Sequence, residues 1–298
     1  MLANAAVPIP RPDPVAYLLL LMVGGMIALT LPLAKLAMTA GLSPLAYAFW
    51  QALGGGVLLW LWNGRSATRP PGTWRYWLVS GLTAIAIPNA LAFIVVGHVG
   101  SGLTATLYAL PSLATYALSL VLRLERLSAL RTVGLLLGVA GCIRIMSPDT
   151  DGVGSDDLPW LLLGLLVPLS LAFGNVYRSV AWPQGASARQ LAPGMLLGGA
   201  LVLGVGLVVT GRVSALWLPS LEVGAILAVQ AVLAALTYRA FFELQRRSSP
   251  VFLSQIGFVI APAGLVLGIL FFDEQFGAAV WLGVGIVLLG VLLANWKK

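Results

Sequence analysis

Apolar runs of membrane-spanning length are the feature that most limits how this chain can fold. The sequence contains ten such runs, separated by turn-rich or charged breaks. A helix needs about 20 residues to cross the hydrocarbon core of a bilayer. The runs lack the period-two alternation of a barrel strand, so helices are the spanning element that fits. We predict an all-α integral membrane protein of ten transmembrane helices, at residues 15–38, 44–63, 74–97, 101–122, 128–147, 158–181, 188–211, 219–243, 249–272 and 277–296.

Composition supports a lipid environment. The 298 residues are 59% hydrophobic and 9% charged, and the mean hydropathy is +0.97. A water-soluble domain of this length needs more charge to cover its surface. The net charge of +7 could suggest nucleic acid, but the basic residues stand in small groups between apolar runs. That pattern is typical of membrane topology, so we expect a lipid bilayer and no nucleic acid as partner.

The basic residues also predict the orientation. If the N-terminus is cytoplasmic, all 17 Lys and Arg residues except Lys35, Arg144 and Arg212 fall in cytoplasmic ends and loops. Arg178, near the end of the sixth run, is counted among the cytoplasmic ones. The positive-inside rule therefore predicts a multi-pass protein of the cell (inner) membrane with both termini in the cytoplasm.

A repeated pattern relates the two halves of the chain. Glu125 begins the pattern Glu-x8-Gly-x6-Gly, and Glu274 begins a second copy. We predict two five-helix repeats, residues 1–148 and 156–298. Because five is odd, the second repeat would enter the membrane from the opposite side, which makes the repeats inverted. Such duplication favours transport, with the working site between the halves, while the glycines are expected to serve close helix packing.

This arrangement resembles the drug/metabolite transporter superfamily of the EamA type, over almost the whole chain. The resemblance rests on the five-plus-five pattern, on Leu-Glu-Arg-Leu and Asp-Glu-Gln-Phe before the fifth and tenth helices with the glycines that follow, and on Leu-Ser-Pro before the second. Trp50-Gln51 departs from it, because relatives often carry a basic residue there. The resemblance implies a central cavity lined by helices one to four and six to nine, with helices five and ten at the periphery. Within the superfamily, the aromatic amino acid exporters look most similar.

Polar and aromatic groups at membrane depth are the candidates for substrate binding, because they are costly in lipid without partners. Amides both donate and accept hydrogen bonds, and a tyrosine offers an apolar face with one hydroxyl, which suits an amphipathic substrate. Packing between helices or anchoring at the membrane interface remains the alternative for each. The predicted substrate-binding residues are Trp50, Asn89, Tyr108, Tyr116, Gln230, Tyr238 and Gln255. Their cavity would be neutral, which suits zwitterions better than multiply charged anions.

Three prolines and two titratable residues have other predicted roles. Pro88, Pro111 and Pro262 are expected to interrupt their helices and to free backbone carbonyls for an interior site. His98, the only histidine, is a candidate for proton coupling, or is simply solvated at the interface. Glu243 is a candidate for gating, with an ion pair inside its own helix as the alternative.

The predicted function is export of amino acids, including aromatic and other neutral amphipathic metabolites, by alternating access. The alternative within transport is export of cationic or hydrophobic drugs or other metabolites, for which Glu243 is the candidate carboxylate. A lipid-modifying enzyme would need a cluster of acids, histidines or metal ligands, which the sequence lacks. An accessory membrane subunit also fits the motifs. The chain has no nucleotide-binding Gly-x4-Gly-Lys-[Ser/Thr] loop, so ATP-driven transport by this chain alone is not expected. No catalytic residue, cofactor or metal is expected, and the protein would act as a monomer or homodimer.

Overall fold

Eight long apolar helical segments make up most of the structure, a computed structural model that describes residues 13–63, 72–145 and 157–295. Four of them are single continuous helices, and the other four are divided by a short π-helical segment, a 3-10 segment or a turn. The segments are Pro14–Thr39 (α1), Pro44–Asn63 (α2), Thr73–Gly81, Leu82–Ala86 and Ile87–Val99 (α3, η1, α4), Ser101–Thr106, Leu107–Ala109 and Pro111–Val121 (α5, η2, α6), Leu158–Gly164 and Leu166–Val180 (α8, α9), Ala188–Val209 (α10), Leu221–Arg247 (α11), and Pro250–Ser254 and Gly257–Phe272 (α12, α13). Each is long and apolar enough to cross a membrane.

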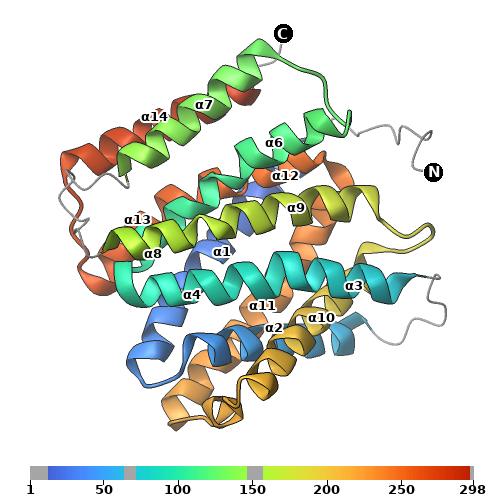
Figure 1. The fold of residues 1–298 in the computed structure, drawn as a ribbon, viewed down its shortest axis with the longest axis vertical. Helices are drawn as coiled ribbons and strands as arrows, with labels where there is room; N and C mark the ends of the chain where they lie inside the picture. Colours follow the sequence, from blue (N-terminus) through green and yellow to red (C-terminus); the bar gives the residue numbers. More distant parts are fainter. Residues whose placement is uncertain (1–12, 64–71, 146–156, 296–298) are drawn as a thin grey trace.

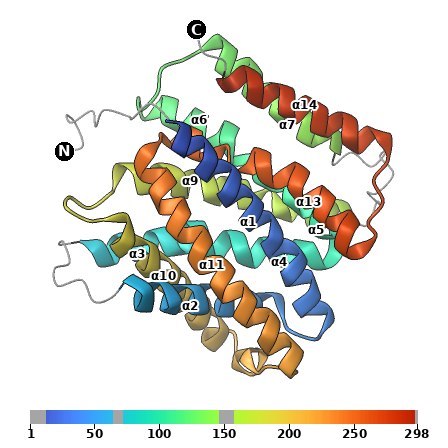
Figure 2. The same ribbon diagram turned by 180° about the vertical axis from the view of Figure 1, so that it is seen from behind.

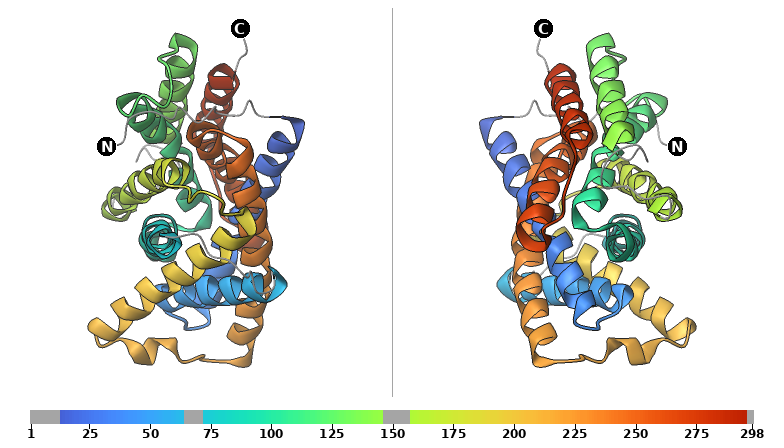
Figure 3. Two further views of the ribbon diagram at one scale, coloured as in Figure 1. Left: turned by 90° about the vertical axis from the view of Figure 1, so that its right-hand side faces the viewer. Right: turned by 90° about the vertical axis from the view of Figure 1, so that its left-hand side faces the viewer.

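The other two predicted spans correspond to shorter helices. They are Ala129–Ile145 (α7) and Ala278–Asn295 (α14), and a 3-10 turn at Val213–Leu216 (η4) connects α10 to α11. In Figures 1 and 2, α7 and α14 run side by side along one edge of the molecule, apart from the other helices. Figure 3 shows the connection between α10 and α11 at the opposite end. The peripheral place of α7 and α14 is the one that the family resemblance implied.

The repeated glycines bring α7 and α14 into contact. A Cβ atom on Gly134 would meet the backbone of Gly290, and a Cβ atom on Gly141 would meet the backbone of Gly283. The first glycine of each copy therefore packs against the second glycine of the other. Because glycine has no side chain, the two helix backbones can approach closely. The two copies of the sequence pattern are thus contact partners of each other.

Large apolar side chains cover much of the outer surface. Leu21 is 58% exposed and Leu270 71% exposed, although each lies well inside a long helix. A monomeric soluble protein rarely exposes such contiguous apolar surface. This surface matches the lipid environment that the composition predicts.

Breaks in two helices meet at the centre of the bundle. The 3-10 turn η2 interrupts the fourth segment just before Pro111, and α12 ends at Ser254, three residues before α13 begins at Gly257. A Cβ atom on Gly257 would collide with the backbone of Tyr108, in η2. The two interrupted helices therefore cross at their breaks, where backbone groups leave the regular helical pattern.

The prolines do not all act as predicted. A π-helical segment, η1, lies immediately before Pro88, and Pro111 begins α6 after the 3-10 turn. Pro262 does not interrupt its helix, because α13 continues through it, and a kink at this proline stays a prediction. The break in that segment lies upstream, where the amide of Phe258 donates to the carbonyl of Gln255. The close contact at Gly257, rather than a missing proline N–H, accompanies the break.

Candidate functional site

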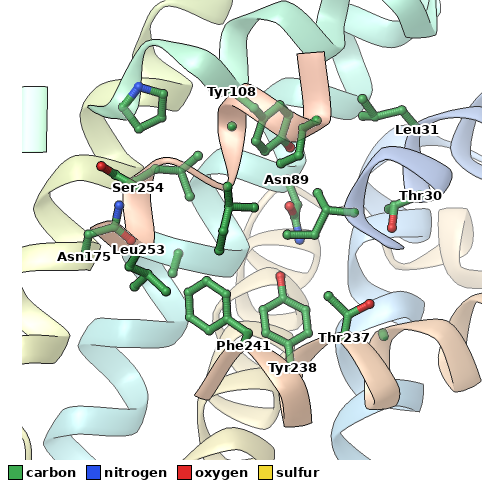
Figure 4. Close-up of a pocket in the computed structure, with 18 of the residues that line it drawn as sticks. Thr30, Leu31, Asn89, Tyr108, Asn175, Thr237, Tyr238, Phe241, Leu253 and Ser254 are labelled. Carbon is green, nitrogen blue, oxygen red and sulfur yellow. The ribbon is translucent and has the colours of Figure 1, made fainter. Parts of the chain in front are cut away.

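A small, partly open cavity of about 70 Å³ lies where the interrupted helices meet α1, α2, α9 and α11 (Figure 4). One water molecule needs about 10–15 Å³ on this measure, so the space equals about five to seven waters. Residues from both halves of the chain line it: Ile27, Thr30, Leu31, Gln51, Ala84, Asn89, Tyr108, Pro111, Leu171, Asn175, Arg178, Ala234, Thr237, Tyr238, Phe241, Leu253, Ser254, Ile256, Gly257 and Ile260. Most of these are apolar or aromatic, with a few converging polar groups, as in small-molecule sites.

Three of the predicted substrate-binding residues line this cavity. Asn89, Tyr108 and Tyr238 come from α4, η2 and α11, and the hydroxyl of Tyr238 points towards Asn89 (Figure 4). Asn89 is only 7% exposed, and its Nδ2 has no hydrogen-bond partner among the described residues. A buried amide donor without a partner is costly, so it is available to a ligand.

Two predicted residues lie behind the cavity wall. Gln230 is fully buried, and its Nε2 donates to Oγ1 of Thr30, 3.4 Å away. Thr30 itself lines the cavity. Gln255 lies in the break between α12 and α13, where its neighbours Ser254 and Ile256 line the cavity instead. Gln230 therefore contacts a lining residue, and neither Gln230 nor Gln255 lines the cavity itself.

Trp50 and Tyr116 have structural partners away from the cavity. The indole Nε1 of Trp50 donates to the carbonyl of Leu216 in η4, at 3.1 Å. The hydroxyl of Tyr116 accepts a hydrogen bond from the amide of Ser128 at 2.9 Å. These contacts tie helices to connecting segments, so the structure does not bring either residue to the cavity.

The two titratable candidates also lie outside the cavity. His98 stacks on Trp160, with ring centroids 3.5 Å apart, at the exposed end of α4. Glu243 pairs with Arg246 at 2.7 Å and with Arg247 at 2.6 Å, both on α11. The ion pair inside the helix is therefore present, whereas proton coupling and gating stay predictions.

Arg178 is a buried charge near the end of α9, two residues before Val180. Its side chain is fully buried and lines the cavity. Nη2 donates to Oδ1 of Asn175 at 2.6 Å, and Nε donates to Oε1 of Gln245 at 3.1 Å. The guanidinium carbon lies 5.2 Å from the ring centre of Phe241. A count of basic residues records position along the chain and cannot reveal this burial, which involves Gln245 and Phe241 of α11.

The cavity is therefore not neutral, and that expectation is wrong. Arg178 is the one charged residue among the residues that line it. Nη1 of Arg178 has no hydrogen-bond partner among the described residues. Sequence reasoning had a usable signal, because Asn175 and Arg178 lie three residues apart in an apolar run and so share a helix face.

Glu274, the first residue of the second repeat copy, joins three segments at the predicted outer face. Its Oε1 pairs with Nζ of Lys35, at the end of α1, at 2.7 Å. The amides of Ser101 and Gly102 each donate to this carboxylate at 3.0 Å. These two amides belong to the first turn of α5, where unpaired N–H groups favour a negative charge. The contact closes α1 and α5 against the segment before α14.

The first copy makes a different contact. Glu125, at the predicted inner face, pairs with Arg131 at 2.8 Å, only six residues along the chain. This ion pair stays within one connecting segment and the start of α7. The two equivalent glutamates therefore differ: the outer one bridges separate helices and the inner one does not.

Comparison with known proteins finds a family model that matches part of the chain and two distant relatives. A model of the EamA-like transporter family matches residues 14–147. An uncharacterized transporter from Synechocystis sp. is 25% identical over 284 residues, which cover 87% of this chain and 83% of that protein. A WAT1-related chloroplastic protein from Arabidopsis thaliana is 27% identical over 182 residues, or 58% of this chain and 43% of that protein. The family model and these distant relatives support an EamA-like transporter.

A solved structure shares the fold. Its TM-score is 0.66 at 17% sequence identity, and the match covers 93% of this chain and 96% of the other. At this identity the likeness concerns the fold alone. Because the match covers 93% of this chain, it extends into the half outside the family match, and this architecture has already been seen in a crystal structure.

Proposed function

We propose that this EamA-like protein transports small amphipathic metabolites, amino acids among them, and that the central cavity is its substrate site. The observation that carries the proposal is a cavity at the crossing of two interrupted helices, lined by residues from both halves of the chain. In membrane transporters, broken helices at mid-depth expose backbone groups to a substrate. The resemblance to the aromatic amino acid exporter YddG makes aromatic amino acids the first substrates to test.

The proposed mechanism is alternating access between two inverted repeats, residues 1–148 and 156–298. Two contacts support it: the repeated glycines of α7 and α14 pack reciprocally, and the breaks of the fourth and last long segments cross. Glu274 joins α1 and α5 at the predicted outer face, whereas its counterpart Glu125 pairs only with Arg131 at the start of α7. We infer a form that is closed to the outside, in a cell (inner) membrane with both termini cytoplasmic, as a monomer or homodimer.

Export of cationic drugs is less well supported. A cation in a buried site needs a carboxylate, and no acidic residue lines the cavity. Glu243, the candidate for that role, is neutralised by Arg246 and Arg247 at the end of α11. The positive charge of Arg178 would repel a cation from the same space.

Counterflow in proteoliposomes tests the transport proposal. Purified protein is reconstituted into vesicles loaded with one unlabelled amino acid, and uptake of the labelled compound is followed across a panel with aromatic members first. We expect Tyr238→Phe to lower uptake, because it removes the hydroxyl that points towards Asn89. Tyr17→Phe is the matched control, since Tyr17 packs on Phe252 at the surface of α1. The absence of counterflow for every panel member would refute the proposal.

A further inference from the structure

The charge of Arg178 has no counter-ion in the described part of the chain. Two of its nitrogens donate to the side-chain oxygens of Asn175 and Gln245, and the third, Nη1, has no partner there. Neutral amide oxygens satisfy hydrogen bonds but do not cancel a charge. None of the ion pairs between described residues includes Arg178. A buried charge without an opposite charge is unfavourable. An anion that binds in this space would therefore give Arg178 the counter-ion that the described residues do not provide.

The surroundings of Arg178 suit a particular kind of anion. A guanidinium group presents its N–H donors in a planar fork that matches a carboxylate. Next to it, the ring of Phe241 and the apolar residues Leu171 and Ile256 line the same cavity. Asn89 adds an unpaired amide donor on the wall of the same cavity. The site therefore offers one guanidinium group, one further hydrogen-bond donor and an otherwise largely apolar wall.

We propose that Arg178 binds the carboxylate of the transported substrate, and that the site selects small monocarboxylates with an apolar or aromatic body. The inference rests on the proposed transport function and narrows its substrate class. One positive charge balances one carboxylate and no more. Because no acidic residue lines the cavity, an ammonium group on the substrate finds no opposite charge there. Simple carboxylic acids should therefore bind at least as well as the corresponding amino acids, and amines should not bind.

The competing explanation is that Arg178 only holds α9 against α11, through Gln245. In that case its charge would be incidental to binding. The two explanations separate when a counter-ion is built into the protein. Asn175 Oδ1 lies 2.6 Å from Nη2, so Asn175→Asp would place a carboxylate against the guanidinium with almost no change in shape.

Ligand-induced thermal stabilisation of the detergent-solubilised full-length protein tests the proposal. The probes are matched pairs: phenylacetate with phenylacetamide, 3-methylbutanoate with its amide, and phenylalanine with phenylalaninamide, each up to about 10 mM. We expect the acids to raise the melting temperature and the amides to leave it unchanged. Arg178→Gln should weaken acid binding by about 30-fold or more, as expected when one partner of a buried charge pair is removed. Arg75→Gln, an exposed site on α3 with the same change in charge, should bind the acids as the wild type does.

Asn175→Asp keeps the test decisive if Arg178→Gln does not fold. The new carboxylate should stabilise the ligand-free protein and weaken acid binding by about tenfold or more, because it competes for the same guanidinium. Equal stabilisation by acids and amides, no stabilisation by any acid, or unchanged acid binding in Asn175→Asp would each overturn the proposal. Binding is measured without vesicles, so acid-selective binding with no counterflow would refute transport and leave the carboxylate site standing.

Discussion

Glu274→Gln is the change that most directly loosens the closed outer face. The carboxylate is 14% exposed and its partner Lys35 is 24% exposed, so the contact is shielded from solvent. Glutamine keeps the shape and one acceptor oxygen, but it loses the charge and turns an NH2 group towards the donors of α1 and α5. A hydrogen bond to a charged group contributes about 1.5–3 kcal/mol, and glutamine loses at least one such contact, so the loss should be about 2 kcal/mol or more. At about 1.4 kcal/mol per tenfold, the outer face should open about 30 times more often or more.

Cysteine labelling measures this opening. Thr30→Cys places a thiol in the cavity, in a Cys142→Ala background that removes the only native cysteine. A membrane-impermeant maleimide is then added to right-side-out vesicles. We expect Glu274→Gln to raise the labelling rate by about 30-fold or more. Glu222→Gln, an exposed site at the start of α11 on the same predicted face, should not change the rate. Equal labelling with and without Glu274 would show that this contact does not close the outer face.

Three further changes test the packing. Gly290→Ala should destabilise the protein by about 1–3 kcal/mol, because its Cβ would meet the backbone of α7, whereas Gly285→Ala has open space and should be neutral or slightly stabilising. Gly257→Ala should be more damaging, because its Cβ would meet the backbone of Tyr108 where the interrupted helices cross; unchanged melting would contradict that crossing. Ser220→Ala should cost about 1 kcal/mol, since its side chain accepts from a first-turn amide of α11. Thermal unfolding in detergent measures all of them.

The spanning segments could be predicted because hydropathy is a local property of about 20 consecutive residues. The cavity was partly predictable for the same reason, since Asn89 and Tyr238 are polar groups near the middle of apolar runs and the bundle brings them together. The reciprocal packing of the repeated glycines could not be predicted from spacing alone. The spacing indicates that glycines lie on one face of a helix, but not which other helix that face contacts.

Two features of the cavity have tertiary causes. The burial of Arg178 could not be predicted, because a charge count records position along the chain and not the contacts with Asn175 and Gln245. Pro262 was expected to break its helix, yet the break occurs near Gln255, next to the contact between Gly257 and Tyr108. Both features depend on neighbours that are distant in sequence, and they lie at the cavity for which we propose a function.

Access to the cavity from the two sides of the membrane tests the central claim most directly. Ser254→Cys, in the Cys142→Ala background, places a thiol on the cavity wall contributed by α12. An impermeant thiol reagent is applied to right-side-out and to inside-out vesicles, with and without phenylacetate. Alternating access predicts labelling from both sides and protection by phenylacetate in both preparations. Labelling from one side only, or from neither, would contradict the account.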